Sequence, residues 1–453
     1  MGLGGAGISA LAKLLASAGH EVTGCDSAQS PYYEIANIKC ELGHSEEHIK
    51  KYNPDVLIYT SAVDQNCPEI KFAREKNIEV IPRGLALSKL FNAKSGIGIA
   101  GAHGKTTTSS MTGLIFLKAN FSPTVYIGAN VPDFGGTNAI AGTSEFFIAE
   151  LDESDGSFEY FTPATTIITN ADWDHVDHFH TRDDFINAFT RFADGRKKNS
   201  PLIICAEDEG ASLVIERCNK NTGKIIRYGF GRKWEWGAAE IQHIGGGGSV
   251  STIFHDGQEI GKLNLRVSGE HNILNALASI AAAHENGIDF KKSSEILKDF
   301  HGSERRMQIK GEINNILVID DYAHHPSEMK ATLDAIHEIY KDRRVILIYQ
   351  PHRFSRTAQF AKNIAEIMCN KNLVAKSFLM PVYSAGEHEI LNSSSNEIIK
   401  AAENELKIEN NITPVDFDNA VENLKSVTRP NDILLTMGAG DVYKIGEKFL
   451  SYN

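Results

Sequence analysis

The chain has 453 residues, and its 46 Lys and Arg against 58 Asp and Glu give a formal net charge of −12 at pH 7, which excludes the overall basic field by which proteins attract nucleic acid. A composition of 42% hydrophobic and 23% charged residues is typical of a compact globular protein, and at roughly 150 residues per domain the length predicts about three domains. No apolar run approaches the roughly 18 residues of a membrane span, and the first residues predict no signal peptide.

The first predicted domain, residues 1–93, is a Rossmann-like α/β unit that begins with a glycine-rich turn. Gly2, Gly4 and Gly7 fit the spacing G-x-G-x-x-G, and Asp26 follows roughly 20 residues on, where a ribose or base partner would lie. Glycine lets backbone N–H groups approach a diphosphate, so a nicotinamide dinucleotide or a nucleotide sugar would fit equally. The buried strand that should precede the turn is missing. We expect either a start farther upstream or a first domain without that strand.

The second predicted domain, residues 94–305, contains a phosphate loop. A short apolar strand over 96–100 runs into the sequence GAHGKTTT over 101–108 and then into a helix, the order of a nucleoside triphosphate site in a parallel-sheet ATPase domain. Lys105 can reach the β- and γ-phosphates, and the Thr106 hydroxyl can hold Mg²⁺. The spacing is a tight G-x-x-G-K-T-T variant. A glycine turn capped by a threonine is the alternative.

Acidic side chains and a histidine follow two further predicted strands of this domain. Glu150 comes directly after the apolar strand 146–149, Glu153 lies shortly beyond it, and His175 follows the strand predicted over 165–169. Because ligands bind at the carboxyl ends of parallel strands, these groups are candidate Mg²⁺ ligands beside a triphosphate, with Glu150 preferred over Glu153. A solvated acidic loop and a structural histidine are the alternatives.

The third predicted domain, residues 306–453, alternates strands and helices as a doubly wound α/β unit. One of its strands ends in DDYAHHP over 320–326, and the next ends in QPHRFSR over 350–356. Histidines and arginines are therefore expected at neighbouring strand ends, where an arginine fork suits a carboxylate or a phosphate. Surface ion pairs are the alternative interpretation.

Nine motifs follow one another along the chain: GLGGAG, GAHGKTTT, AELDESDGSF, NADWDHVDHF, SGEHNILNA, GSERR, DDYAHHPSE, QPHRFSRT and MGAGD. In this order they resemble the Mur ligases of peptidoglycan synthesis, and within that family the members that join L-alanine to UDP-N-acetylmuramic acid. The resemblance implies that the three domains hold UDP-sugar, ATP and the incoming amino acid. It also implies a reaction in which ATP converts the lactyl carboxylate to an acyl phosphate, which the amine attacks to give an amide, ADP and phosphate.

The resemblance also assigns roles to residues. Lys105 would stabilise the transferring phosphoryl group. Thr106 and Glu150 would bind a first Mg²⁺, and Glu150 and His175 would share a second. The other implied ATP contacts are Gly101, Ala102, His103, Gly104, Thr107, His271, Asn272, Asn275, Arg305, Arg306 and Asp321. The implied UDP-sugar contacts are Gly4, Gly5, Ala6, Gly7, Asp26, Ser61, Thr137 and Asn138. The implied amino-acid contacts are Tyr322, His324, His352, Arg353 and Arg356.

Other functions fit parts of the sequence. A murein-tripeptide-recycling ligase belongs to the same family, but its stretch corresponding to QPHRFSR differs. Several sibling ligases carry a carbamoylated lysine after the metal-binding histidine, whereas no lysine lies between His175 and Phe192, as in the L-alanine-adding members. A P-loop switch would need N-K-x-D, and a nicotinamide oxidoreductase would leave Lys105 and Glu150 unexplained. His175 and His324 are both possible bases for the amine.

The six cysteines are scattered and form no C-x-x-C pair. This pattern argues against a zinc site and against a disulfide framework, and it predicts a reducing, cytoplasmic location.

Overall fold

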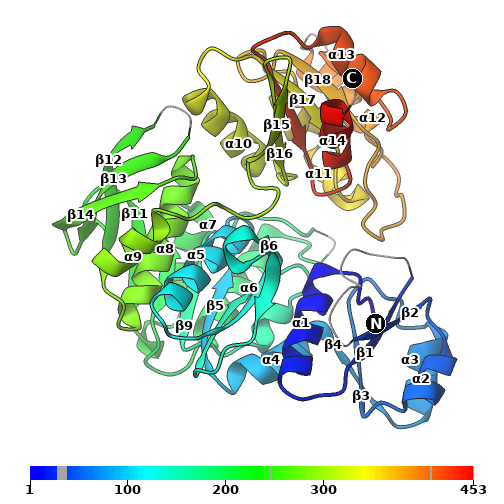
Figure 1. The fold of residues 1–453 in the computed structure, drawn as a ribbon, viewed down its shortest axis with the longest axis vertical. Coiled ribbons are helices and arrows are strands. Elements are labelled where there is room, and N and C mark those ends of the chain that lie inside the picture. The colour runs from blue at the N-terminus through cyan, green and yellow to red at the C-terminus, as the bar shows by residue number, and fades with distance from the viewer. Residues whose placement is uncertain (28–37, 177, 245–246, 409–410, 452–453) are drawn as a thin grey trace.

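The computed structural model describes residues 1–27, 38–176, 178–244, 247–408 and 411–451. Figure 1 shows three α/β units: an N-terminal unit in blue, a central unit in cyan to green and a C-terminal unit in yellow to red. The predicted three-domain α/β architecture is confirmed, while the exact boundaries at residues 93 and 305 stay predictions. Across these described ranges, no helix is both long and apolar enough to cross a membrane.

The N-terminal unit has its strands in two parallel pairs, β1 with β2 and β3 with β4. Its elements are α1 (Ala6–Ser17), β1 (Thr23–Asp26), β2 (Lys39–Leu42), α2 (Glu46–Tyr52), β3 (Val56–Tyr59), α3 (Pro68–Glu75), β4 (Glu79–Pro82) and α4 (Arg83–Asn92). In the described part of the chain, no strand joins the two pairs. Instead, Gly2 N donates to the carbonyl of Cys25 at 2.9 Å, and the Met1 ammonium donates to the carbonyl of Ile58 at 2.6 Å. A cavity of about 460 Å³ is lined by residues of β1, β3 and α1, so it lies between the two strand pairs.

The central unit is built on one ten-stranded sheet in the order β14-β13-β12-β11-β10-β9-β5-β8-β6-β7. Its strands are β5 (Ser95–Ala100), β6 (Thr124–Val131), β7 (Thr137–Ile140), β8 (Phe146–Glu150), β9 (Thr165–Ile168), β10 (Leu202–Cys205), β11 (Ile225–Phe230), β12 (Trp236–His243), β13 (Ser249–His255) and β14 (Gln258–Leu265). Its helices are α5 (Lys105–Lys118), α6 (Arg182–Asp194), α7 (Glu209–Arg217), α8 (Glu270–Glu285) and α9 (Phe290–Leu297), with short 3-10 turns η2 (Pro132–Phe134), η3 (Ser157–Tyr160) and η4 (Lys220–Thr222).

The middle of this sheet is parallel and buried on both faces, which explains its near-continuous apolar strands. Helices α5, α8 and α9 pack on one face, and α4, α6 and α7 pack on the other. Strand β5 lies between β8 and β9, so the loop that follows it emerges at the centre of the carboxyl edge.

The C-terminal unit has a six-stranded sheet in the order β15-β16-β20-β17-β18-β19, with β15 antiparallel at one edge. Its elements are β15 (Gln308–Ile313), β16 (Ile316–Asp321), α10 (Pro326–Ile339), β17 (Val345–Tyr349), α11 (Phe354–Met368), β18 (Lys376–Leu379), α12 (Asn396–Lys400), the π-helical turn η5 (Ala401–Leu406), β19 (Ile412–Pro414), α13 (Ala420–Val427), β20 (Ile433–Met437) and α14 (Tyr443–Ser451). Helices cover both faces. The predicted histidine- and arginine-bearing segments follow β16 and β17, the two strands that flank β20.

The link between the central and C-terminal units changes its attachments within a few residues. Ser303 Oγ lies 3.1 Å from Ser110 Oγ on α5, and Glu304 N donates to a backbone carbonyl of β6 at 3.3 Å. Arg305 adopts a left-handed φ of 59°. Its guanidinium donates to the Asp320 carboxylate of β16 at 2.9 Å and to two backbone carbonyls just after β20 at 2.6 and 2.9 Å. Two residues are therefore fastened to the central unit and the next to the C-terminal unit.

Candidate active site

The phosphate loop joins β5 to the first turn of α5. Gly101 and Gly104 have φ values of 144° and 78°. A Cβ atom on Gly101 would lie 2.0 Å from Thr169 Oγ1, and one on Gly104 would lie 2.6 Å from Asn275 Oδ1. Both positions therefore require glycine for backbone conformation and for space. Since α5 begins at Lys105, the unpaired N–H groups of its first turn face the loop, as they do in an anion site.

Lys105 is folded back onto the loop. Its ammonium donates to the carbonyls of Gly101 at 2.5 Å and Ala102 at 3.2 Å, and to Glu153 Oε1 at 2.8 Å. Burial lowers the pKa of Lys105, but the carboxylates of Glu153 and Glu150 outweigh it and the net pKa is raised. The side chain is therefore a fixed positive charge at the start of α5.

Thr106, Glu150, Glu153 and His175 form a group that fits a hard divalent cation. Thr106 Oγ1 donates to Glu150 Oε1 at 3.0 Å, and Gly128 N donates to Glu150 Oε2 at 2.8 Å. His175 Nε2 lies 3.5 Å from Glu153 Oε1. Glu153 Oε2 and His175 Nδ1 are buried and have no hydrogen-bond partner among the described residues. Oxygen donors with unused lone pairs beside a phosphate loop are what Mg²⁺ coordination needs.

The start of α8 packs against the phosphate loop. Thr108 Oγ1 donates to Asn275 Oδ1 at 3.1 Å, Asn275 Nδ2 donates to Asn272 Oδ1 at 3.2 Å, and Asn272 Nδ2 donates to a backbone carbonyl at 2.7 Å. Burial, and then the positive charge of Arg306, lower the pKa of His271 to about 4. The His271 imidazole is therefore neutral. The side-chain amides of Asn272 and Asn275 hold the start of α8 against the first turn of α5.

The arginines at the head of the C-terminal unit face the same region. Arg306 Nη1 donates to Glu328 Oε1 at 3.3 Å. The Asp321 carboxylate accepts two backbone N–H groups at 2.7 and 2.8 Å and the Thr332 hydroxyl at 3.2 Å. Burial raises the pKa of Asp321 to about 6, against the opposing effect of Arg306. In this structure, Asp321 thus orders the turn after β16.

The predicted amino-acid group lies at the carboxyl ends of β16 and β17. The guanidinium of Arg356 donates to both carboxylate oxygens of Asp174 at 3.1 and 2.9 Å, and each residue is only 3 to 4% exposed. Its third nitrogen lies 3.0 Å from His352 Nδ1. Burial lowers the pKa of His324 to about 3, so this ring is neutral. The arginine fork predicted to bind a carboxylate therefore already holds one, supplied by the central unit.

The first glycine turn is closed by the carboxylate at the end of β1. Gly4 N donates to Asp26 Oδ2 at 2.7 Å, as the spacing of the two residues suggests. Gly5 is the N-cap residue of α1 and has an extended backbone with φ −85°. Gly5 and the exposed Ser61 border a common cavity, so the turn and the end of β3 face it together.

Side chains of the central unit fasten the start of α1. Tyr126 Oη donates to the Gly7 carbonyl at 3.0 Å, and Asn138 Nδ2 donates to the preceding carbonyl at 2.7 Å. Lys13 Nζ donates to Thr137 Oγ1 at 3.3 Å and to Asn138 Oδ1 at 3.1 Å. Asn138 is fully buried. Thr137 and Asn138 therefore dock the N-terminal unit on the central sheet.

One cavity of about 860 Å³ lies where the three units meet. The predicted site residues that line it are Gly5, Ala6, Gly7, Ser61, Ala102, Gly104, Lys105, Thr106, Glu150, His175, Arg305, Arg306, Tyr322, His324, His352, Arg353 and Arg356. The predicted residues outside its lining are Gly4, Asp26, Gly101, His103, Thr107, Thr137, Asn138, His271, Asn272, Asn275 and Asp321. The lining set thus combines the glycine turn, the phosphate loop and the arginine group in one continuous space.

Three family models together match most of the chain. The Mur ligase family, catalytic domain, matches residues 1–95, the Mur ligase middle domain matches 99–283, and the Mur ligase, glutamate ligase domain, matches 305–440. The chain belongs to the Mur ligase family.

Curated relatives extend this membership over the full length. A UDP-N-acetylmuramate--L-alanine ligase of Lawsonia intracellularis is 38% identical over 455 residues, covering 100% of this chain and 98% of that protein. A protein of the same name from Desulforapulum autotrophicum is 36% identical over 453 residues, covering 99% and 97%. The crystal structure of UDP-N-acetylmuramate-alanine ligase MurC from Thermotoga maritima is similar with a TM-score of 0.80 and 27% identity, covering 99% and 97%.

Sequence reasoning missed several residues of this Mur ligase site. Arg83 lines the cavity and donates to Asp152 at 2.8 Å, but it lies in none of the quoted motifs. Asp152 lies in the motif from which the sequence predicts Glu150 and Glu153 as ligands, and Asp174 lies in the motif from which it predicts His175. The roles of these residues depend on contacts between the units, and a local sequence pattern does not reveal such contacts.

A second missed group joins the phosphate loop to the C-terminal unit. His103 lies 3.2 Å from Asp172 Oδ2 and 3.4 Å from Glu328 Oε1, and Ser327 Oγ donates to Asp172 at 2.6 Å. The rings of His103 and His325 are 4.8 Å apart. Burial alone lowers the pKa of His103, but the Glu328 and Asp172 carboxylates raise it to about 9. His103 is therefore an imidazolium that links the two units at neutral pH.

Proposed function

We propose that this chain is an ATP-dependent ligase that joins the lactyl carboxylate of UDP-N-acetylmuramic acid to the amine of L-alanine in peptidoglycan synthesis. The observation that carries the proposal is the single cavity of about 860 Å³ shared by the glycine turn, the phosphate loop and the arginine group. A ligation of three substrates needs their reacting ends in one space. The full-length likeness to ligases of that name supports the same substrates.

We assign residues 1–93 to the nucleotide sugar, 94–305 to ATP and 306–453 to the amino acid. The first turn of α1, whose residues Ala6 and Gly7 line the cavity, suits the UDP diphosphate, with Ser61 beside it. Asp26 acts indirectly by holding the turn, since its carboxylate is bound to Gly4 N. This division places the sugar nucleotide, ATP and the amino acid at three sides of one cavity, and it fits an enzyme of the cytoplasm.

The residues at the phosphate loop would assist phosphoryl transfer by electrostatic stabilisation. Lys105 offers a buried positive charge that can exchange Glu153 and the loop carbonyls for the γ-phosphate. Thr106, Glu150 and His175 would hold Mg²⁺, with Glu153 close enough to contribute. When bound, Mg²⁺ offsets charge on the phosphate oxygens. No covalent protein intermediate is needed, because the carboxylate oxygen of the sugar attacks the γ-phosphorus and ADP leaves.

The amino acid is held by the group after β16 and β17. Arg356 already binds a carboxylate bidentately, which is the geometry that the L-alanine carboxylate requires. Tyr322 and His352 line the cavity beside it. Because its pKa is lowered to about 3, His324 is a weak proton acceptor at neutral pH, and we assign it to positioning. The amine, after giving up its extra proton to water, attacks the acyl phosphate carbonyl, and phosphate leaves.

The test is phosphate release by the purified chain with Mg-ATP and UDP-N-acetylmuramic acid, with L-alanine, glycine, L-serine or murein tripeptide added in separate reactions. We expect release that requires both the sugar nucleotide and L-alanine. Release that depends on the tripeptide would support a recycling ligase instead. Release that does not depend on the sugar nucleotide would contradict the proposed reaction.

A further inference from the structure

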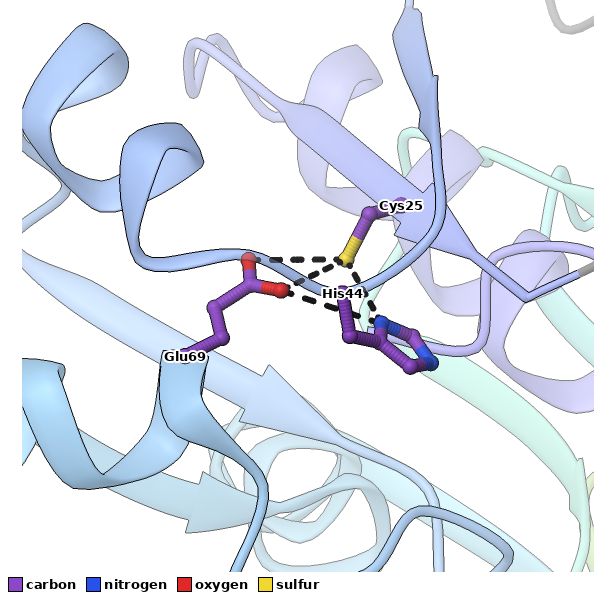
Figure 2. A group of neighbouring side chains, drawn as sticks. All are labelled: Cys25, His44 and Glu69. Carbon is purple, nitrogen blue, oxygen red and sulfur yellow. Dashed lines mark hydrogen bonds and ion pairs between the residues drawn. The ribbon is translucent and has the colours of Figure 1, made fainter.

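A second group of metal-ligating side chains lies in the N-terminal unit, outside the active-site cavity. Figure 2 shows Cys25 from β1, His44 from the loop before α2 and Glu69 from the first turn of α3 pointing toward one another. Cys25 Sγ lies 3.4 Å from His44 Nδ1 and 3.3 Å from Glu69 Oε2, and His44 Nδ1 lies 3.7 Å from the same oxygen. The scattered cysteines argue against a zinc site in the sequence, because their spacing cannot reveal ligands that come from three separate elements.

The distances between these three ligand atoms match those between neighbouring ligand atoms of a bound metal ion. Zinc bonds are about 2.3 Å to sulfur and about 2.0 to 2.1 Å to nitrogen and oxygen. In a tetrahedral site, neighbouring ligand atoms are therefore about 3.3 to 3.6 Å apart. A triangle with edges of 3.3, 3.4 and 3.7 Å encloses a point at about bonding distance from all three atoms. Small side-chain movements would bring the three atoms to bonding distance, and the fourth position of the tetrahedron would be left to water or to a further side chain.

A second histidine supports the carboxylate of this triangle. His48 Nδ1 lies 3.5 Å from Glu69 Oε1, and it is buried without a hydrogen-bond partner among the described residues. The backbone N–H of Ser45 donates to Glu69 Oε2 at 3.2 Å. Metal-binding carboxylates are commonly oriented in this way by outer groups. His48 is therefore a positioning residue that can also approach the ion.

The charge balance of the group favours a cation. Glu69 is 2% exposed, and the ion-pair partners that the described residues give it are two histidines rather than a lysine or an arginine. A buried carboxylate is costly unless it is paired. Burial raises the pKa of the Cys25 thiol, so the metal-free thiol is protonated, and metal binding would release that proton to water as the sulfur–metal bond forms.

An ion has a path to the group. Cys25, His48 and Glu69 line the cavity of about 460 Å³ between the two strand pairs. His44 is 20% exposed at the surface. Because β1 belongs to one strand pair and α3 connects β3 to β4 of the other, an ion here would link the two halves of the divided sheet.

We propose that Cys25, His44 and Glu69 bind one Zn²⁺-like divalent ion that joins the two halves of the N-terminal unit. One thiolate, one imidazole and one carboxylate suit Zn²⁺ better than Mg²⁺, which prefers oxygen ligands. The site is separate from the Mg²⁺ group at the phosphate loop and does not depend on the proposed activity. A bound ion would support the end of β1, where Asp26, the residue after Cys25, holds the first glycine turn.

Cobalt titration of the full chain, freed of metal and kept reduced, tests the site. A Co²⁺–thiolate bond gives a near-ultraviolet charge-transfer band that cobalt at an oxygen and nitrogen site, such as the phosphate loop, does not give. We expect one equivalent of Co²⁺ to produce the band and Zn²⁺ to displace it. The band should be lost in Cys25→Ser and retained in Cys40→Ser, which changes a cysteine of the neighbouring strand β2. No band in the unchanged chain, or a band that persists in Cys25→Ser, would overturn the proposal.

Two further variants keep the test independent of the cysteine. His44→Ala, at a partly exposed position, should weaken Zn²⁺ binding at least about 100-fold, and His48→Ala should weaken it about 10- to 100-fold, as the loss of an outer group does. Binding is measured by competition with a chromogenic chelator, and circular dichroism checks the fold. Unchanged zinc affinity in folded His44→Ala would also overturn the proposal.

Discussion

The two glycine turns of the molecule both lead into a helix, but different parts of the structure hold them in place. The phosphate loop follows β5, which lies in the middle of a ten-stranded sheet between β8 and β9. The first turn, at Gly2 to Gly7, precedes β1 in a sheet divided into two pairs, and it is held by the Asp26 carboxylate and by Tyr126 and Asn138 of the central unit. The phosphate loop is thus rigid through its sheet, and the first turn through side chains from elsewhere.

This difference separates the effects that substitutions should have. A change at the phosphate loop leaves the surrounding sheet intact and removes charge from the transferring phosphate, so it should reduce the rate of the chemical step. A change at the first turn should loosen the contact between two units, so it should reduce stability and the affinity for the nucleotide sugar.

The largest effect is expected for Lys105→Ala. Removing the charge at the start of α5 should lower kcat about 10³-fold, because no other lysine contacts the loop carbonyls and Glu153 in the described contacts. Phosphate release under saturating substrates measures the loss. Lys118→Ala, at the exposed far end of the same helix, is the matched control and should keep the full rate. An unchanged kcat in Lys105→Ala would contradict a role of the phosphate loop in phosphoryl transfer.

Arg356→Lys should have the next largest effect. A lysine keeps the charge but loses the bidentate fork, so kcat/KM for L-alanine should fall about 100-fold through KM, while KM for ATP changes little. Initial rates at varied L-alanine measure this. Lys362→Ala, on an exposed face of α11, is the control. An equal rise in both KM values would assign Arg356 to holding the two units together rather than to the amino acid.

A pair of glycine substitutions tests the support of the first turn. A Cβ on Gly7 would lie 2.7 Å from Arg83 Nη1 and 2.9 Å from Tyr126 Oη, whereas the atom nearest to one on Gly5 would be the Gly2 carbonyl oxygen at 3.5 Å. Gly7→Ala should therefore cost about 1 to 3 kcal/mol of stability, and Gly5→Ala should cost much less. Chemical denaturation of both variants measures the difference. Equal costs would mean that Tyr126 and Arg83 do not fasten the turn.

The smallest effect is a pH dependence at His103. Its folded pKa of about 9 lies above the ordinary value of 6.5, so its contribution to stability is complete below pH 6.5 and is lost as pH rises through 9. The Tm of the unchanged chain should therefore fall more steeply between pH 6.5 and 9 than that of His103→Gln, by a few degrees. His180→Gln, at an exposed position, should keep the slope. Parallel slopes in all three proteins would show that His103 is not charged in the fold.

Much of the fold could be predicted because its strands are continuous apolar runs and its loops carry glycine at fixed spacing. The phosphate loop and the acidic end of β8 were found in this way. The contact of Arg356 with Asp174 joins residues 182 positions apart, and no local pattern encodes it. Cys25, His44 and Glu69 likewise come together only through the packing of β1, the loop before α2, and α3. Contacts between separate elements depend on tertiary structure, which motifs do not specify.

The hydrogen bonds of residues 303 to 305 determine the point about which the C-terminal unit can rotate. Ser303 and Glu304 are bonded to the central unit, and Arg305 is bonded at three points to the C-terminal unit. A rotation of the C-terminal unit would therefore change the backbone dihedral angles on either side of the Glu304–Arg305 peptide bond, where the hydrogen bond from Arg306 N to the Ser303 carbonyl at 3.3 Å also spans the link. Arg305 and Arg306 would move together with the C-terminal unit. A rotation of that unit away from the phosphate loop would therefore withdraw two positive charges from the loop and open a route by which ADP can leave.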